Sequence, residues 1–316
     1  MRGLRAGLST LAFAALVPAS ADAARPLTPA PKVTTPVVRT TSATPSVPSV
    51  PSLPDTMGGR SGKLRARFVS PRRDGGIRIL RQLFGDSAAQ RPGIYHAADS
   101  AGGRRFALIN LLPFQARERG KLGRYRIGFW PGESRASWVA NKSPEGFIEV
   151  TQGNQDTQVS ENFRLRDFLT HDQQEVWPKY LVLREALVDK LELVISDLRA
   201  RGIAVSHLSV MSGFRTPQYN AKGVGPLGGR AKDSRHQYGD AADVFVDNDR
   251  DGRMDDLNRD GRVDTRDAMV VLQSVERIES NYPELIGGAG LYRATSAHGP
   301  FVHVDVRGSR ARWGRS

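Results

Sequence analysis

The sequence predicts an α+β protein with a small, mainly β N-terminal domain, followed by a C-terminal domain that combines strands and helices. Between about residues 75 and 168, short apolar or alternating runs are separated by Gly, Pro and Asp, which is typical of β-strands. Further along, strand-like runs lie on either side of a helical pattern, and an earlier apolar stripe has helical spacing. That stripe consists of Leu183, Leu187, Leu191, Val194 and Leu198.

The first 24 residues have the pattern of a secretory signal peptide. Arg2 and Arg5 precede an apolar stretch from Leu8 to Val17, and residues 21–23 place small side chains at a cleavage position. An uncleaved membrane anchor is the alternative, but about ten apolar residues fall short of the ~20 that a spanning helix needs. We therefore expect an exported protein, periplasmic, associated with the cell wall or secreted, with no transmembrane segment after cleavage.

Residues 25–59 and 60–168 differ sharply in composition. The first range is rich in Pro, Thr, Ser and Val and predicts an extended, disordered linker, because it cannot bury a core. The second predicts the mainly β domain, which contains no catalytic constellation and whose role stays open. Its strands are expected at 93–97, 104–114, 125–132 and 146–153.

Residues 169–310 predict the second domain. A long helix is expected with Pro178 in its first turn and Gly202 at its end. A second helix is expected over 265–282, where Pro283 terminates it. The residues after this domain, 311–316, predict a basic tail. Strands are expected at 203–210, 241–247 and 301–306.

The chain has no cysteine and a formal net charge of +13. Without Cys, any metal ion must be bound by His, Asp and Glu. The basic excess indicates an acidic partner, such as nucleic acid, anionic lipid or a cell-wall polymer. No nucleic-acid-binding module is recognisable, so we expect no nucleic acid partner. The basic runs at 60–81 and 307–315 predict a solvated surface, with weak adhesion to an anionic wall or membrane surface as the alternative.

Two separated segments carry side chains that can bind a metal ion. Between His236 and Asp243, the residues Gly239, Ala241 and Ala242 are small and allow a tight turn. Asp243 begins an apolar strand, where a carboxylate is costly unless it is paired or bound to a metal. His303 and Asp305 share one face of a later strand, because alternate residues do. Two imidazoles and one carboxylate are a ligand set of catalytic zinc, which leaves a fourth position for water.

These segments resemble the motifs of zinc D-alanyl-D-alanine peptidases and related murein endopeptidases that share a hedgehog-type fold. The family pattern Ser-x-His-x-x-Gly-x-Ala-x-Asp matches Ser234 to Asp243, and a later His on a strand matches His303. An upstream Ser-Gly-aromatic-Arg…Asn pattern matches Ser212 to Asn220. The resemblance covers roughly residues 160–308 and implies a zinc metallopeptidase that cleaves peptidoglycan stem peptides, as a D,D-carboxypeptidase or a murein endopeptidase. The zinc ligands that it implies are His236, Asp243 and His303, and the substrate-binding residues are Arg215, Ser234 and Asn220.

The resemblance also implies catalytic roles. Arg215 would polarise the scissile carbonyl or bind a substrate carboxylate through its two-pronged guanidinium. Many family members have a Glu three residues before the last His ligand, where this chain has Pro300. Others have a His five residues before it, which is His298 here. We therefore expect His298 to be the base or to stabilise the transition state, and Asp305 to orient a ligand His.

An acidic insertion at residues 247–267 predicts calcium binding. Two 12-residue windows begin at Asp247 and Asp256, each with oxygen ligands at alternate positions and Gly at the sixth. They overlap and lack Glu at position 12, so one or two ions in a compact turn, as in dockerin-like or thrombospondin-like repeats, fit better than two EF-hands. The alternative is a solvated loop without metal. The predicted ligands are Asp247, Asp249, Asp251, Asp256, Asn258, Asp260, Asp264 and Asp267.

Two other classes of function compete with the peptidase. One is a non-catalytic module that binds wall peptide or calcium on the same fold. This alternative stays open because Pro300 stands where many family members have a Glu. The other is a structural wall-anchoring protein, suggested only by the linker and the charge. If calcium binds, we expect it to brace the strand that carries Asp243, because Asp247 ends the same strand.

Overall fold

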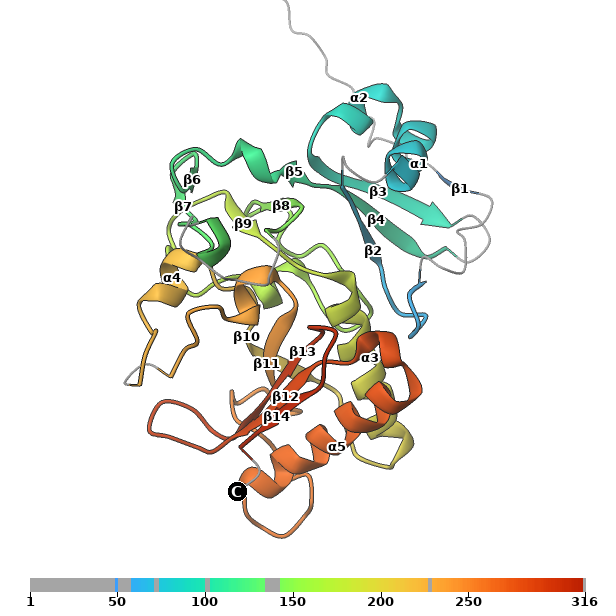
Figure 1. Ribbon diagram of the computed structural model, residues 1–316. Coiled ribbons are helices and arrows are strands. Elements are labelled where there is room, and N and C mark those ends of the chain that lie inside the picture. Colours follow the sequence, from blue (N-terminus) through green and yellow to red (C-terminus); the bar gives the residue numbers. More distant parts are fainter. Residues whose placement is uncertain are drawn as a thin grey trace, which may run out of the picture. The chain divides into compact units, whose positions relative to one another are not determined.

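The computed structural model describes residues 49–50, 58–70, 74–99, 103–133, 143–226 and 229–314. The predicted signal peptide lies outside these residues, as does the predicted linker except for residues 49–50 and 58–59. The described part confirms the mixed α+β class, with five α-helices and several small sheets (Figure 1). None of the described helices is both long enough and apolar enough to cross a lipid bilayer.

The N-terminal region contains a four-stranded sheet in the order β1-β3-β4-β2. Strands β3 and β4 lie where the sequence predicts strands, but two helices precede them that the sequence analysis missed. Helix α1 packs Ile77, Leu80 and Leu83 against the sheet residues Val69 and Phe106. This apolar stripe is interrupted by arginines, which is why the segment resembled a basic run. The bounds are β1 (Ser49–Val50), β2 (Ala66–Val69), α1 (Asp74–Phe84), α2 (Asp86–Gln90), β3 (Gly93–Asp99) and β4 (Arg105–Asn110).

Between this sheet and the C-terminal region the chain forms smaller units. A three-stranded sheet has the order β5-β8-β9, and β6 pairs with β7 in a hairpin. The strand predicted over 125–132 ends at Arg126, so that prediction is wrong for residues 127–132. The bounds are β5 (Leu112–Pro113), β6 (Lys121–Leu122), β7 (Tyr125–Arg126), β8 (Gly146–Val150) and β9 (Lys179–Leu181), with 3₁₀ turns η2 (Phe114–Ala116), η3 (Pro131–Glu133) and η4 (Leu165–Phe168).

Helix α3 (Glu185–Ala200) is shorter than predicted. Its end is as expected, because Gly202 adopts a left-handed conformation with φ of 77°. The prediction that Pro178 lies in its first turn is wrong, since the residues that follow Pro178 form strand β9. The apolar residues from Tyr180 to Leu183 are consecutive, which suits a buried strand, whereas helical spacing begins at Leu187.

The C-terminal region is built on a five-stranded sheet in the order β10-β11-β13-β12-β14 (Figure 1). Helix α5 confirms the second predicted helix and packs against β12, β13 and α3. The strand predicted at 203–210 begins only at Leu208. The bounds are β10 (Leu208–Ser212), α4 (Pro217–Ala221), η5 (Arg235–Tyr238), β11 (Ala241–Val246), α5 (Thr265–Asn281), η6 (Pro283–Leu285), β12 (Gly288–Tyr292), β13 (Phe301–Asp305) and β14 (Ala311–Trp313).

The predicted basic tail is in part an edge strand. Residues 311–313 form β14, which pairs in parallel with β12. The arginines near it are used in ion pairs: Arg307 binds Asp305, and Arg312 binds Glu279. The main hydrophobic core runs from Leu64 to Val306, so the two predicted domains share one core.

Candidate metal centre

Strand register places two of the predicted metal ligands side by side. Ser212, Asp243, His303, Gly290 and Trp313 are successive register partners and form one row across the five-stranded sheet. Directly paired residues project from the same face of a sheet. The opposite face of the two central strands carries buried apolar residues, which are Ala242, Val244, Val246, Val302 and Val304. Alternation along β11 and β13 therefore fixes Asp243 and His303 on one face.

The third ligand comes from outside the sheet. His236 lies on the 3₁₀ turn η5, which ends at Gly239 with φ of 66°. A Cβ atom at Gly239 would lie 2.3 Å from the carbonyl oxygen of Val182, so both the backbone conformation and the close approach require glycine. The turn brings His236 back over the strand that starts at Ala241.

The three predicted zinc ligands converge, as expected. His236 Nε2 lies 3.2 Å from His303 Nδ1 and 3.3 Å from Asp243 Oδ1. His303 Nδ1 lies 2.9 Å from the same carboxylate oxygen. All three residues are buried, and their ligand atoms lie within 4.8 Å of one another. Among the described residues, this group is the one that combines imidazole and carboxylate donors in a geometry suited to a metal ion.

The protein also binds the atom of each ligand that faces away from the site. His236 Nδ1 lies 2.7 Å from the carbonyl oxygen of Gly213, which can only accept, so Nδ1 carries the proton and Nε2 has the lone pair. His303 Nε2 lies 3.2 Å from Asp305 Oδ2. Asp305 is itself bound by Arg307 and by the backbone N–H of Gly288. These contacts hold Asp305 against the ring of His303, which is the position expected of a residue that orients this imidazole.

Arg215 binds a ligand side chain. Its Nη2 donates to Asp243 Oδ2 at 2.5 Å, and its Nε donates to Ser212 Oγ at 2.8 Å. Its backbone N–H donates to the carbonyl oxygen of His236, which ties the two motifs together. The side chain is 15% exposed. Arg215 therefore holds the ligand carboxylate in place and offsets its charge.

Burial and these contacts shift the acid–base behaviour of the triad. Burial lowers the pKa of His236. Burial alone would raise the pKa of Asp243, but the facing imidazoles hold it well below its ordinary value. Burial also opposes protonation of His303, yet its hydrogen bonds to Asp243 and Asp305 outweigh this and raise its pKa. Protonation is thus favoured on His303 and disfavoured on His236.

The contacts of the other predicted site residues are with groups outside the triad. The ring of His298 packs edge-on against Phe301 with centroids 5.0 Å apart, and its Nδ1 lies 2.8 Å from the carbonyl oxygen of Gly299. Asn220 is buried and donates from Nδ2 to the carbonyl oxygen of Ala231, which closes the loop after α4. Ser234 is buried at the start of η5.

Two aromatic residues near the triad were missed by the sequence analysis. The ring of Trp313 lies 5.2 Å from that of His303, over the space left by Gly290. Its Nε1 donates to the hydroxyl of Tyr292, whose ring stacks on Phe301 at 4.5 Å. No local motif marks these residues; only the pairing of β14 with β12 brings Trp313 to the site.

The acidic segment contains a second candidate cation site. Carboxylate oxygens of Asp247, Asp249 and Asp255 lie within 4.8 Å of one another. Asp247 and Asp249 were predicted, whereas Asp255 was missed although it is the ninth residue of the first window. Met254 and Leu257 are buried in the main core and anchor the segment. The remaining predicted oxygen ligands lie elsewhere along the segment; they are Asp251, Asp256, Asn258, Asp260, Asp264 and Asp267.

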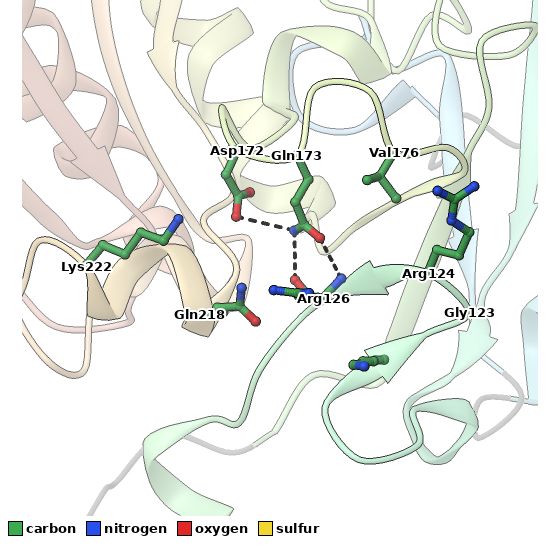
Figure 2. A pocket seen from close by; sticks show the side chains of 9 residues that line it. Gly123, Arg124, Arg126, Asp172, Gln173, Val176, Gln218 and Lys222 are labelled. Carbon is green, nitrogen blue, oxygen red and sulfur yellow. Dashed lines mark hydrogen bonds between the residues drawn. The ribbon is translucent and has the colours of Figure 1, made fainter. Parts of the chain in front are cut away.

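A basic pocket of about 550 Å³ lies near α4 (Figure 2). Lys121, Arg124, Arg126 and Lys222 line it, and none of them forms an ion pair with a described residue. Gln173 fixes one wall, because its side-chain amide accepts from the N–H of Arg126 at 2.7 Å and donates to its carbonyl oxygen at 2.9 Å. Helix α4 begins two residues after Arg215, and its residue Gln218 lines the pocket.

No family model matches the chain, and no curated protein is significantly similar to it.

Proposed function

We propose that this chain is a zinc peptidase with the hedgehog-type fold, and that His236, Asp243 and His303 bind the ion. The convergence of these three buried side chains is the observation that carries the proposal. Two nitrogens and one oxygen form the donor set of catalytic zinc sites, which keep a fourth position open. The outward atoms of both imidazoles are bound by Gly213 and Asp305, so the inward nitrogens suit a metal.

The chain supplies groups for peptide hydrolysis around this site. When bound, zinc supplies Lewis-acid chemistry, which polarises a peptide carbonyl and makes water more acidic near neutral pH. Arg215 orients Asp243 and places a cation beside the reacting carbonyl. His298 remains the proposed proton carrier: its Nδ1 donates to the carbonyl oxygen of Gly299, so Nε2 can accept a proton and pass it to the leaving amine.

The proposed substrates are peptidoglycan stem peptides, in a protein exported to the periplasm or the cell wall. Stem peptides carry several carboxylates. The pocket beside α4 is lined by four cations that form no ion pair with a described residue, and by one carboxylate, that of Asp172. The net charge of +13 also favours adhesion to an anionic wall or membrane surface. D,D-carboxypeptidase and murein endopeptidase activity both fit this arrangement.

A non-catalytic module that binds wall peptide is the second candidate. Pro300 favours it, because it occupies the position where many similar peptidases have a catalytic Glu. As a further part of the proposal, the acidic segment 247–267 binds Ca²⁺, since its donors are oxygens alone.

Digestion of purified peptidoglycan tests the peptidase. We expect the zinc-loaded chain to release fragments with new amine ends, identified by mass spectrometry, and a chelator to stop the reaction. Loss of D-Ala would indicate a carboxypeptidase, and loss of cross-links an endopeptidase.

His303→Ala should abolish this activity, whereas His96→Ala, which changes an exposed imidazole on β3, should retain it. Binding of peptidoglycan without new amine ends, by protein shown to contain zinc, would favour the non-catalytic module.

A further inference from the structure

The two windows of the acidic segment form turns with the same backbone hydrogen bonds. In each, the N–H of the sixth residue, Gly252 or Gly261, donates to the first Asp of its window. The N–H groups of the fifth residues, Asp251 and Asp260, donate to the side chain at the third position. The turn hydrogen bonds of the two windows are therefore equivalent. The windows differ in which protein groups neutralise their carboxylates.

In the first window, no described Lys or Arg offsets the charge of Asp247, Asp249 and Asp255. Asp247 is only 3% exposed, and its Oδ1 has no hydrogen-bond partner among the described residues. Oxygens of Asp249 and Asp255 lie within 4.8 Å of it, and no described Lys or Arg forms an ion pair with these three residues. A buried carboxylate oxygen without a hydrogen-bond partner is costly, and neighbouring like charges add to that cost. A bound cation removes both penalties.

The second window is neutralised by the protein itself. The guanidinium of Arg266 contacts Asp260 at 2.7 Å and Asp264 at 2.8 Å. Asp267, at the twelfth position, is fully buried, and its oxygens accept from three backbone N–H groups, those of Leu257, Asn258 and Asp264. It caps helix α5 together with Asp264. Three of the predicted ligands of the second window, Asp260, Asp264 and Asp267, are thus already bound by other groups of the protein.

We propose that the segment binds one Ca²⁺, in the first window, through Asp247, Asp249 and Asp255, and that this ion fixes the end of strand β11. The proposal rests on the calcium part of the proposed function and is independent of peptidase activity. Ca²⁺ accepts six to eight oxygens in a flexible geometry, and backbone carbonyls and water can complete the set. Mg²⁺ is less suited, because it demands a near-ideal octahedron.

The first window is attached directly to the strand that carries a triad residue. Asp247 follows the last residue of β11, and its N–H donates to the carbonyl oxygen of His207. The N–H of Asp255 donates to the carbonyl oxygen of Val246 at 3.0 Å. An ion that joins Asp247 to Asp255 therefore clamps the turn onto the strand end, four residues from Asp243.

Calorimetric titration of the chelator-treated full chain with CaCl₂ tests the site. We expect one equivalent to bind, with Asp255→Asn weakening the affinity roughly tenfold or more because a charged ligand is lost. Asp260→Asn is the matched control, one charge removed from the second window, and should leave the affinity unchanged. Two equivalents, equal weakening by both variants, or no binding by protein whose circular dichroism shows it folded would each overturn the proposal.

Hydrogen exchange tests the clamp. Calcium should slow exchange of the amides in residues 241–247 of the wild-type chain but not of Asp255→Asn, while β12 serves as the internal reference. Unchanged exchange in 241–247 would overturn the clamp. Repeating the titration with His303→Ala separates the two ideas: calcium binding should persist there, so a failed peptidase would not affect this result.

Discussion

The His–Asp–His triad and the first acidic window both gather cation ligands, but the protein supports them differently. In the triad, the second polar atom of every ligand is bound: His236 by Gly213, Asp243 by Arg215 and His303 by Asp305. In the first window, Asp247 Oδ1 is buried without a partner among the described residues. The protein's own contacts therefore organise the triad, whereas the window leaves one buried carboxylate oxygen for the proposed calcium ion.

Two consequences follow for the metal-free protein. The triad keeps its geometry because Arg215 and the hydrogen bonds to the imidazoles offset the buried carboxylate. The first window has no such internal cation, so removal of its ion leaves the repulsion among its carboxylates. Variants that weaken the support of the triad should thus affect zinc, and variants that neutralise the window should affect calcium.

The largest expected effect concerns Asp305, which supports His303 from behind. Asp305→Asn keeps the size of the side chain but removes the charge that orients and polarises the imidazole. We expect zinc affinity to fall by about 10- to 100-fold, the usual range for such outer residues. Competition with a coloured chelator measures it, and Glu284→Gln, which changes an exposed carboxylate on η6, is the control. An unchanged affinity would show that the triad does not depend on its outer contacts.

A pH dependence of zinc binding is the next effect in size. Hydrogen bonds to two carboxylates raise the pKa of His303 above the ordinary value, so the metal-free site keeps a proton there that zinc must displace. Affinity should be independent of pH above this raised pKa and should fall about tenfold for each unit below it. Calorimetry in buffers of different ionisation enthalpy should detect the released proton.

Local sequence patterns predicted the three residues of the triad and one supporting residue, Asp305, but not the other contacts that hold the triad. His236, Asp243 and His303 stand in motifs of fixed spacing, and alternation along strands placed two of them on one face. Gly213, Trp313 and the contact of Arg215 with Asp243 depend on pairing between strands that are far apart in sequence. Such pairing leaves no periodic signal, so these partners could not be inferred.

The acidic segment shows the same limit in a shorter stretch. The repeated windows were recognisable from the spacing of Asp and Gly. Asp267 caps helix α5, and Arg266 neutralises the second window. Both roles depend on the position at which α5 begins. The sequence analysis did not include Asp255, which directly precedes the second window. The structure places its carboxylate beside that of Asp247.

The smallest expected effect comes from Arg266, whose ion pairs with Asp260 and Asp264 distinguish the second window from the first. Its ion pairs are exposed and screened by solvent, so Arg266→Gln should leave the midpoint of thermal unfolding nearly unchanged. The same change frees Asp260 and Asp264, and calorimetry should then detect a second, weaker calcium equivalent. Arg259→Gln, which removes a neighbouring charge without an ion pair among the described residues, should still bind one. If Arg266→Gln also binds only one, then the hydrogen bonds of Asp267, rather than the guanidinium, keep the second window closed.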